Sequence, residues 1–222
     1  MIYTFWEGKK PSYIELCMET WDFPYIVLNY DNLNKYTDLP IDKLKRFSIL
    51  QQSDAVRVHV LRDNGGYWLD CDTIMNGTEL PHTMFVGDNA KRINSVGYLY
   101  AEKPKLPIFK SWAKYQDKIL EGDEVSKDWA LMANAFSDPY LKKHPKIEIG
   151  NIYDYWLETG NEHDRRRKYV DYYFRQSMMP QLPNMVMLHN SWTPKWYKDL
   201  PRSEVLAINC TLSNILKRKV KQ

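Results

Sequence analysis

The sequence predicts an α/β protein with a Rossmann-like, mostly parallel central sheet flanked by helices. Residues 2–6 form a short apolar strand, a helical pattern opens at Pro11, and a second apolar strand covers residues 25–29. A strand, a helix and a strand within about thirty residues form a βαβ unit, whose two strands run parallel. A third strand, predicted over residues 67–72, comes directly after a further helix.

That helix is predicted to begin with Ser53 as its N-cap, because apolar residues recur after this position. It ends at Asn64-Gly65-Gly66, where glycine permits a C-cap and a tight turn. Apolar runs then predict later strands, and helical spacing predicts later helices. These strands cover residues 84–87, 96–100 and 185–189, and the helices cover residues 107–121, 126–137, 164–175 and 203–219.

The composition suits a globular α/β protein and gives no sign of a nucleic-acid partner. The chain has 222 residues, of which 44% are hydrophobic, enough for a sizeable core. Its 31 basic and 28 acidic residues leave a net charge of +3, too mild a surplus to indicate nucleic-acid binding. Aromatic residues make up 14%. Such rings can stack on a sugar or a nucleobase, and they also fill hydrophobic cores.

Cysteine usage and hydropathy favour a cytoplasmic protein. Cys17, Cys71 and Cys210 are too few and too widely spaced for a disulfide framework or a zinc knuckle, which favours a reducing compartment. No signal peptide is expected, because the N-terminus has neither a basic leader nor a long apolar run. No stretch approaches the roughly 18 apolar residues that a membrane span needs.

Asp70 and Asp72 are the strongest candidates for chemistry in the sequence. On a strand, residues i and i+2 point to the same side, so both carboxylates would converge while Cys71 faces the opposite way into packing. Two adjacent carboxylates are unfavourable unless a cation lies between them, and oxygen ligands suit Mg²⁺ or Mn²⁺. Such a metal would neutralise a diphosphate leaving group. The alternative is a strand end that carries two solvated acids.

A second polar pair precedes these acids. Asp54 and Arg57 lie at positions i and i+3, on one face of the predicted helix. The pair is either a local ion pair worth roughly 0.2–0.5 kcal/mol or a pair aimed at a ligand. Its helix runs into Gly65-Gly66 and the strand that carries Asp70. Both features could therefore share one cleft at the carboxyl end of that strand, where open α/β sheets bind ligands.

Three segments carry a resemblance to a known family. The run S-D-x-x-R-x-x-x-L-x-x-x-G-G-x-W-L-D-x-D over residues 53–72 resembles the D-x-D region of the family 32 sugar transferases. That group includes capsular polysaccharide transferases and yeast mannosyltransferases, and the glucosylating clostridial toxins carry a similar stretch. Residues 2–8 resemble the first strand of this family, and His189-Asn190-Ser191-Trp192 resembles its C-terminal element. The first strand departs from the family by having Tyr3-Thr4 where Pro and His are usual.

The resemblance implies a GT-A type fold and a retaining transfer of a sugar from a nucleotide sugar, with UDP as the expected nucleotide. Trp6 would then lie near the nucleotide base, although it could equally be a core residue. Asp54 and Arg57 would hold the donor sugar. Asp70 would contact the ribose or the sugar and share the metal. The catalytic residues would be Arg57, Asp70 and Asp72.

The same resemblance assigns the C-terminal element to the diphosphate. Asp72 would bind the metal and the pyrophosphate. His189 or the neighbouring Ser191 would complete the metal or diphosphate site, and Trp192 would contact the diphosphate. His189 also ends an apolar strand, so it could be a histidine of the core. The expected cofactor is Mn²⁺ or Mg²⁺.

The chain is expected to form one GT-A type catalytic domain over residues 1–202, followed by an amphipathic basic helix over residues 203–222. Apolar residues recur in this segment at helical spacing, and basic residues crowd its end. The helix could bind an anionic membrane surface, where each basic residue contributes on the order of 1 kcal/mol. Alternatively, it packs on the core and its basic end suits the helix dipole.

The resulting prediction is a hexosyltransferase that moves a sugar to a glycan or a lipid-linked acceptor in capsular or extracellular polysaccharide synthesis. We expect it in the cytoplasm, with peripheral contact at the inner face of the plasma membrane. A metal-dependent phosphodiesterase or nucleotidyltransferase would also pair carboxylates, but it would need further acids or histidines near Asp72. A carbohydrate-binding module without turnover would account for the aromatic residues alone.

Overall fold

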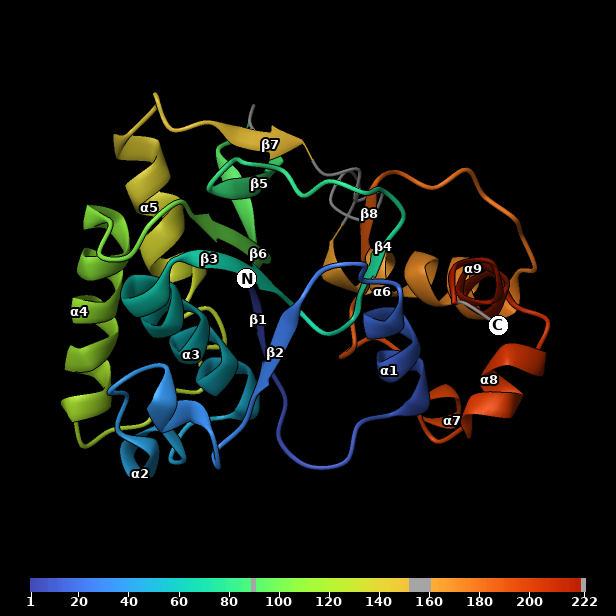
Figure 1. Cartoon of the computed structure of the whole chain (residues 1–222), viewed down its shortest axis with the longest axis horizontal. Coiled ribbons are helices and arrows are strands. Elements are labelled where there is room, and N and C mark those ends of the chain that lie inside the picture. Colours follow the sequence, from blue (N-terminus) through green and yellow to red (C-terminus); the bar gives the residue numbers. More distant parts are fainter. Residues whose placement is uncertain (89–90, 152–160, 221–222) are drawn as a thin grey trace. The chain divides into compact units, whose positions relative to one another are not determined.

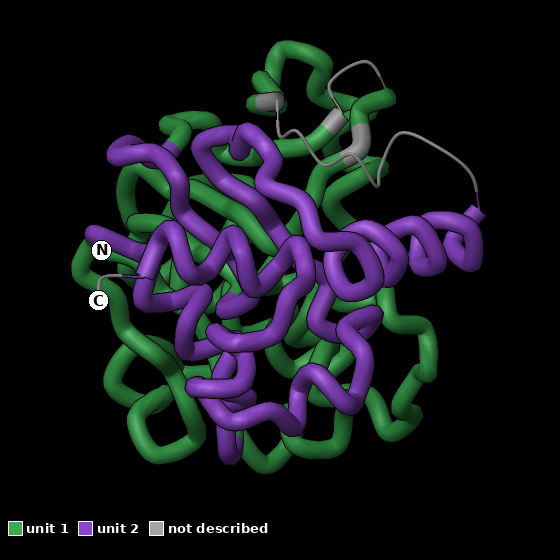
Figure 2. Tube along the Cα trace, turned by 90° about the vertical axis from the view of Figure 1, so that its right-hand side faces the viewer, with its two compact units in different colours: residues 1–7, 23–70, 81–151 green, residues 8–22, 71–80, 152–222 purple. Residues whose placement is uncertain are grey.

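The computed structural model of this chain describes residues 1–88, 91–151 and 161–220 (Figure 1). Its contacts divide the chain into two compact units, and each is built from three separate segments of the sequence (Figure 2). The first unit contains residues 1–7, 23–70 and 81–151, and the second contains residues 8–22, 71–80 and 152–222. The single catalytic domain expected over residues 1–202 stays a prediction.

A six-stranded sheet forms the centre of the first unit, as far as its residues are described. In sheet order, the strands are β2 (Tyr25–Leu28), β1 (Ile2–Phe5), β3 (Gly66–Leu69), β6 (Ile93–Ala101), β5 (Phe85–Asp88) and β7 (Ile149–Asn151). Strand β1 pairs in parallel with β2 and β3, and β5 pairs in parallel with β7. Strand β6 runs antiparallel to both of its neighbours. The predicted α/β class, with a mostly parallel central sheet flanked by helices, is confirmed.

Helices of the first unit cover this sheet. Helices α3 and α5 contact the sheet strands, and α4 packs on both of them. The shared core is aromatic and aliphatic, with Trp68, Phe85 and Trp112 completely buried. The elements are η1 (Leu33–Lys35), α2 (Ile41–Leu44), α3 (Ile49–Asn64), α4 (Pro107–Glu121) and α5 (Asn134–Lys143).

Two helix starts differ from the sequence prediction. The N-cap of α3 is Ser48, not Ser53, because Ser48 and Gln51 form a reciprocal capping box. Ser53 therefore lies inside the helix. Helix α5 begins at Asn134, whereas a helix over 126–137 was predicted. Its N-terminal part is a turn instead, because the Asp128 carboxylate accepts a hydrogen bond from the backbone N–H of Ala130.

The turn between α3 and β3 depends on two glycines. Gly65 and Gly66 have φ angles of 66° and 91°, a region that other residues rarely adopt. A Cβ on Gly66 would lie 2.6 Å from the carbonyl oxygen of Met1 on the neighbouring strand. The missing side chain therefore permits both the backbone conformation and the pairing of β3 with β1.

Replacing Gly66 with alanine is expected to lower the free energy of unfolding by about 1–3 kcal/mol, because the added methyl group combines backbone strain with a clash. Gly122→Ala is the matched control, since its new methyl group would have no atom closer than 3.4 Å and its φ is −66°. Urea unfolding of both variants measures the difference. Equal stability of the two variants would contradict the role given to Gly66.

The second unit is mainly helical and contains one short ladder. Strand β4 (Thr73–Met75) pairs antiparallel with β8 (Met185–Met187). Helix α1 belongs to this unit and contacts β4 and α8. Its helices are α1 (Ser12–Glu19), α6 (Glu162–Val170), η3 (Asp171–Arg175), α7 (Lys195–Lys198), α8 (Arg202–Ala207) and α9 (Thr211–Lys219).

The predicted helix over 203–219 is two helices, α8 and α9. The chain breaks between them because the backbone N–H of Thr211 donates to the carbonyl of Gln176, so it cannot continue the helical ladder. The apolar residues of the segment are buried in the second unit, namely Val205, Leu212, Ile215, Leu216 and Val220. Packing on the core, the alternative left open by the sequence, accounts for this apolar stripe. Residues 221–222 lie outside the described residues.

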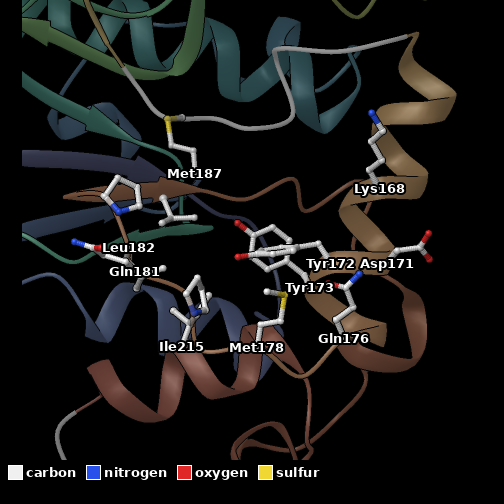
Figure 3. Close-up of a pocket in the computed structure, with 13 residues that line it drawn as sticks. Lys168, Asp171, Tyr172, Tyr173, Gln176, Met178, Gln181, Leu182, Met187 and Ile215 are labelled. Atoms are coloured by element: carbon white, nitrogen blue, oxygen red, sulfur yellow. The ribbon is translucent and has the colours of Figure 1, made fainter.

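The second unit also contains a cavity of about 550 Å³ (Figure 3). Its walls come from α6, η3, β8, α9 and the connection between η3 and β8. Figure 3 shows the rings of Tyr172 and Tyr173 pointing toward its centre. A volume of this size is typical of small-molecule sites.

Candidate functional site

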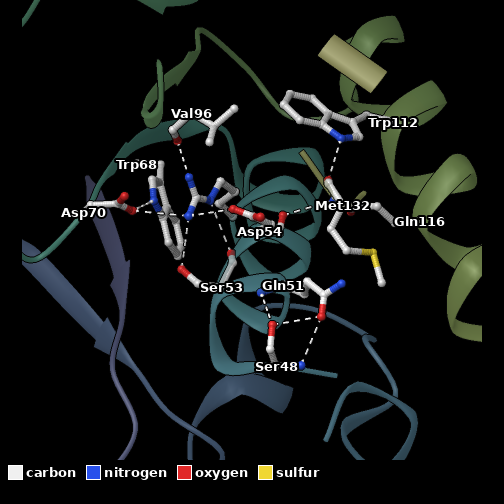
Figure 4. Close-up of polar contacts among 11 residues, drawn as sticks. Ser48, Gln51, Ser53, Asp54, Trp68, Asp70, Val96, Trp112, Gln116 and Met132 are labelled. Carbon is white, nitrogen blue, oxygen red and sulfur yellow. Dashed lines mark hydrogen bonds and ion pairs between the residues drawn. The ribbon is translucent and has the colours of Figure 1, made fainter. Parts of the chain in front are cut away.

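A buried polar cluster of the first unit includes Asp54, Trp68 and Asp70 (Figure 4). Its centre is Arg57. It is 4% exposed, and its Nη2 atom lies 2.9 Å from Asp54 Oδ1 and 3.4 Å from Asp70 Oδ1. The guanidinium also donates to the Val96 carbonyl and lies over the ring of Trp68, 5.3 Å from its centroid. Every side of this charge is thus in contact with protein, which fixes its position.

Asp70 completes this cluster at the end of β3. Its Oδ1 atom accepts a hydrogen bond of 2.8 Å from the indole N–H of Trp68, and its backbone N–H donates to the Gly97 carbonyl. The side chain of Asp70 is 35% exposed, whereas that of Asp54 is 10% exposed. The sequence prediction of an Asp54–Arg57 pair leading to Asp70 is therefore matched by direct contacts. Asp70 is the member of the cluster that a ligand can reach.

The environment of Asp54 changes its acid–base behaviour. Burial raises the pKa of this carboxyl from 3.8 to about 7, the Arg57 charge opposes this shift, and the Asp70 charge adds to it. The folded protein therefore binds a proton at Asp54 at pH values where the unfolded chain does not. This contribution to stability is complete below about pH 4 and is lost as the pH rises through 7.

We expect the difference in unfolding free energy between the wild type and Asp54→Asn to fall as the pH rises. The limiting slope is about 1.4 kcal/mol per pH unit between pH 5 and pH 7. Urea unfolding at several pH values from 5 to 8 measures it, and the asparagine variant removes this titration while other groups stay the same. A constant difference over this range would show that Asp54 is ionised throughout.

The predicted strand over 67–72 ends at Leu69, which corrects the geometry expected for the two acids. Cys71 and Asp72 lie in a turn before β4, so the rule that places residues i and i+2 on one side of a strand does not apply. The chain passes from the first unit to the second between Asp70 and Cys71. The convergence of the Asp70 and Asp72 carboxylates stays a prediction.

Asp72 lies in the second unit, where it is held by the turn after β8. Its Oδ2 atom accepts a hydrogen bond of 2.7 Å from the backbone N–H of Asn190. Its carbonyl accepts from the backbone N–H of Leu188. Asp72 is 8% exposed. The fold thus brings Asp72 next to Asn190, which is 118 positions away in the sequence and belongs to the His189–Trp192 element.

The same turn orients His189 and Trp192. Their rings lie 4.1 Å apart at an angle of 30°, and the His189 backbone N–H donates to the hydroxyl of Tyr169. Trp192 donates its own backbone N–H to the His189 carbonyl, and Ser191 is exposed at the tip. The structure therefore places Asp72 beside the turn that carries His189, Ser191 and Trp192, and their role at a metal or diphosphate stays a prediction.

Two residues of this second cluster were missed by the sequence analysis. Tyr13 donates its hydroxyl to the side chain of Asn190, and burial, followed by the Asp72 charge, raises the pKa of that hydroxyl. Burial lowers the pKa of Lys198, while Asp72 acts in the opposite direction. Lys198 is thus a cation within electrostatic range of Asp72. Neither residue has a sequence signal, because Tyr13 is part of an apolar helix pattern and Lys198 is one of many lysines.

Trp6 follows β1 in the first unit and is partly buried. Its backbone N–H donates to the Leu28 carbonyl. Its indole N–H is shielded from solvent and has no hydrogen-bond partner among the described residues. An unsatisfied buried donor is uncommon in folded proteins and is consistent with a position that a ligand completes.

The described residues include no group of three or more His, Cys, Asp or Glu side chains placed to hold a metal ion. They also include no helix long and apolar enough to cross a bilayer.

A mostly parallel α/β sheet whose third strand ends at an Asp–Arg–Asp cluster defines the class of protein as an α/β enzyme with a polar site at a strand end. The chain belongs to the capsular polysaccharide synthesis protein family, whose model matches residues 2–201. The predicted family resemblance and enzyme class, a glycosyltransferase of capsular polysaccharide synthesis, are confirmed.

Other comparisons add little to this assignment. The chain is similar to a solved structure described as "PaToxG Glycosyltransferase", with 13% sequence identity and a TM-score of 0.46 over 98% of this chain and 86% of that one. No curated protein matches the sequence.

Proposed function

We propose that this protein transfers a hexose from a UDP-sugar to a lipid-linked glycan acceptor, with retention of configuration and with Mn²⁺ or Mg²⁺ as cofactor. The observation that carries the proposal is the Asp54–Arg57–Asp70 cluster, which keeps a buried cation and a reachable carboxylate at the end of β3. A structural ion pair would need only two of these groups. The second carboxylate, that of Asp70, supplies an acceptor for sugar hydroxyls.

In the first unit, Asp70 would accept from hydroxyls of the ribose or the donor sugar, and the buried Asp54–Arg57 pair would hold the Asp70 carboxylate in place. The indole N–H of Trp6 donates to the nucleotide base. These assignments are supported by the partial exposure of the Asp70 carboxylate and by the lack of a hydrogen-bond partner for the buried Trp6 N–H among the described residues. Their fixed orientation would lower the entropy lost when the reacting groups are aligned.

In the second unit, Asp72 and His189 would hold the metal, while Ser191 and Trp192 would contact the diphosphate. The donor chemistry of these residues fits Mg²⁺ or Mn²⁺, because such ions are commonly held by one or two carboxylates plus substrate phosphates and water. A cluster of three protein ligands is therefore not required. When bound, the cation would neutralise charge on the diphosphate leaving group.

Retention follows if the acceptor hydroxyl attacks the face that the diphosphate leaves. The protein would then act by orientation and by electrostatic stabilisation rather than through a covalent nucleophile. Lys198, whose pKa burial lowers and the Asp72 charge raises, would add positive charge near Asp72. A trapped glycosyl-enzyme adduct would contradict this route.

The function is tested with a panel of UDP-sugars and the purified full-length chain. We expect one UDP-sugar to raise the melting temperature in the presence of Mn²⁺, because a ligand that binds only the folded state stabilises it by mass action. The same sugar nucleotide should release UDP slowly without an acceptor. GDP-sugars are the matched control for the nucleotide. Stabilisation by free oligosaccharides, with no UDP release from any donor, would instead indicate a carbohydrate-binding module.

We further propose that the protein works at the cytoplasmic face of the membrane. Because the apolar residues of α9 are buried, this contact would depend on the basic residues at its end. Lys217 and Arg218 are exposed there. Such residues attract anionic lipid surfaces at a range set by the Debye length.

A further inference from the structure

The cavity of the second unit has an aliphatic end and a polar end. Leu182, Val186 and Ile215 form part of the aliphatic end, together with prolines of the same connection. Lys168, Asp171 and Gln176 line it on the side of α6 and η3 (Figure 3). A site with this division suits an amphiphile, because each part of the ligand meets groups of its own polarity.

The charge of the surrounding chain indicates the sign of the polar group. Residues 161–220 contain eleven basic and five acidic side chains, a surplus of six, whereas the whole chain has a surplus of three. Arg218 reaches the carbonyl of Pro180, a residue of the cavity wall, and Lys168 lines the polar end. The acid at this end, Asp171, is paired with Arg175 at 2.8 Å, so the charge of Lys168 favours an anionic head group over a neutral sugar.

The cavity wall is continuous with the elements that hold Asp72. Met187 lines the cavity, and the next residue, Leu188, donates its backbone N–H to the Asp72 carbonyl. On the other side, the ring of Tyr173 lies 4.9 Å from that of Tyr169, whose hydroxyl accepts from the His189 backbone. A ligand in the cavity would thus contact residues that adjoin the candidate diphosphate site within the same unit.

We propose that this cavity binds the hydrocarbon chain of an anionic lipid-linked acceptor, with the phosphate of the head group beside Lys168. The assignment rests on the proposed function, since it names the part of the protein that receives the acceptor. The flexible side chains of Met178 and Met187 suit a hydrocarbon chain of variable shape. The rings of Tyr172 and Tyr173 supply further apolar area and polar edges.

Dodecyl phosphate, kept below its micelle concentration, is the probe, and calorimetric titration of the full-length chain is the measurement. We expect saturable binding with a negative heat-capacity change, the signature of buried apolar surface. Inorganic phosphate and maltotriose at the same concentrations should give no saturable heat. These two controls distinguish binding of an amphiphile from binding of phosphate alone and from binding of a glycan.

Two neighbouring methionines provide matched variants. Met178 lines the cavity and is 45% exposed, whereas Met179 is 59% exposed and is not part of the lining. Met178→Glu should weaken binding of dodecyl phosphate by about tenfold or more, because it places a charge against the hydrocarbon chain. Met179→Glu should leave the affinity unchanged within about twofold. Both side chains are exposed enough for the variants to fold, which melting temperatures verify.

The head group is tested by Lys168→Gln. This variant should lower the affinity for dodecyl phosphate by roughly three- to tenfold. The affinity for dodecyl maltoside, which has a neutral head group, should stay the same. Absence of saturable binding, equal weakening by both methionine variants, or binding of maltotriose that Met178→Glu abolishes would each overturn the assignment. UDP release is measured separately. A chain that binds dodecyl phosphate but releases no UDP would refute the donor proposal and leave the cavity assignment standing.

Discussion

Asp72→Asn is expected to reduce UDP release from the donor sugar by about 10²- to 10³-fold, because a neutral amide cannot replace a carboxylate in holding the metal and its diphosphate. The fold should survive the change, since an asparagine carbonyl can still accept the hydrogen bond from the Asn190 backbone. The measurement is UDP release as a function of Mn²⁺ concentration.

Asp199→Asn is the matched control, because Asp199 is exposed in the same unit and has been given no role at the site. Its rate should remain close to that of the wild type. An Asp72→Asn protein with undiminished release and the same Mn²⁺ dependence would remove Asp72 from the metal site. It would leave the Arg57 cluster as the main support for the proposed function.

Arg57→Met is expected to lower the free energy of unfolding by about 3–5 kcal/mol at pH 8, where Asp54 would otherwise be ionised. Methionine retains much of the apolar contact with Trp68, but it leaves a buried carboxylate without its cation. The loss should be smaller at pH 5, because Asp54 can then be protonated at little cost. Urea unfolding at both pH values measures the effect.

Two further variants test why Arg57→Met lowers the free energy of unfolding. Arg46→Met is the control, since Arg46 is exposed in the same unit and donates only to backbone carbonyls near the end of α4, so it should cost less than about 1 kcal/mol. The double variant Asp54→Asn/Arg57→Met should recover part of the stability, because no buried charge is left uncompensated. Strict additivity of the two substitutions would show that they do not interact.

Local signals accounted for much of the secondary structure. Helix α4 was predicted with its observed bounds, and β1 and β2 were predicted to within one residue. The error at the start of α3 had a local signal that was overlooked, because Ser48 and Gln51 have the spacing of a capping box. By contrast, the split between α8 and α9 follows from a bond between Thr211 and Gln176, and no local pattern contains that information.

The same distinction between local signals and long-range contacts applies to the candidate site. Asp54 and Arg57 are three positions apart on one helix, so the sequence predicted their pairing correctly. The grouping of His189, Ser191 and Trp192 was likewise contained in one short motif. The strand geometry expected for Asp70 and Asp72 was wrong, because β3 ends at Leu69 and Asp72 lies in the turn that follows.

The sequence by itself determined the α/β class, the turn at Gly65-Gly66 and the identity of the candidate polar residues, because each depends on neighbours within a few positions. Only the tertiary structure decided that Asp72 is held by Asn190, that burial raises the pKa of Asp54, and that a cavity forms between α6, β8 and α9. Burial, electrostatic environment and cavities arise from residues distant in the chain, and their effects depend on distances that a linear pattern does not contain.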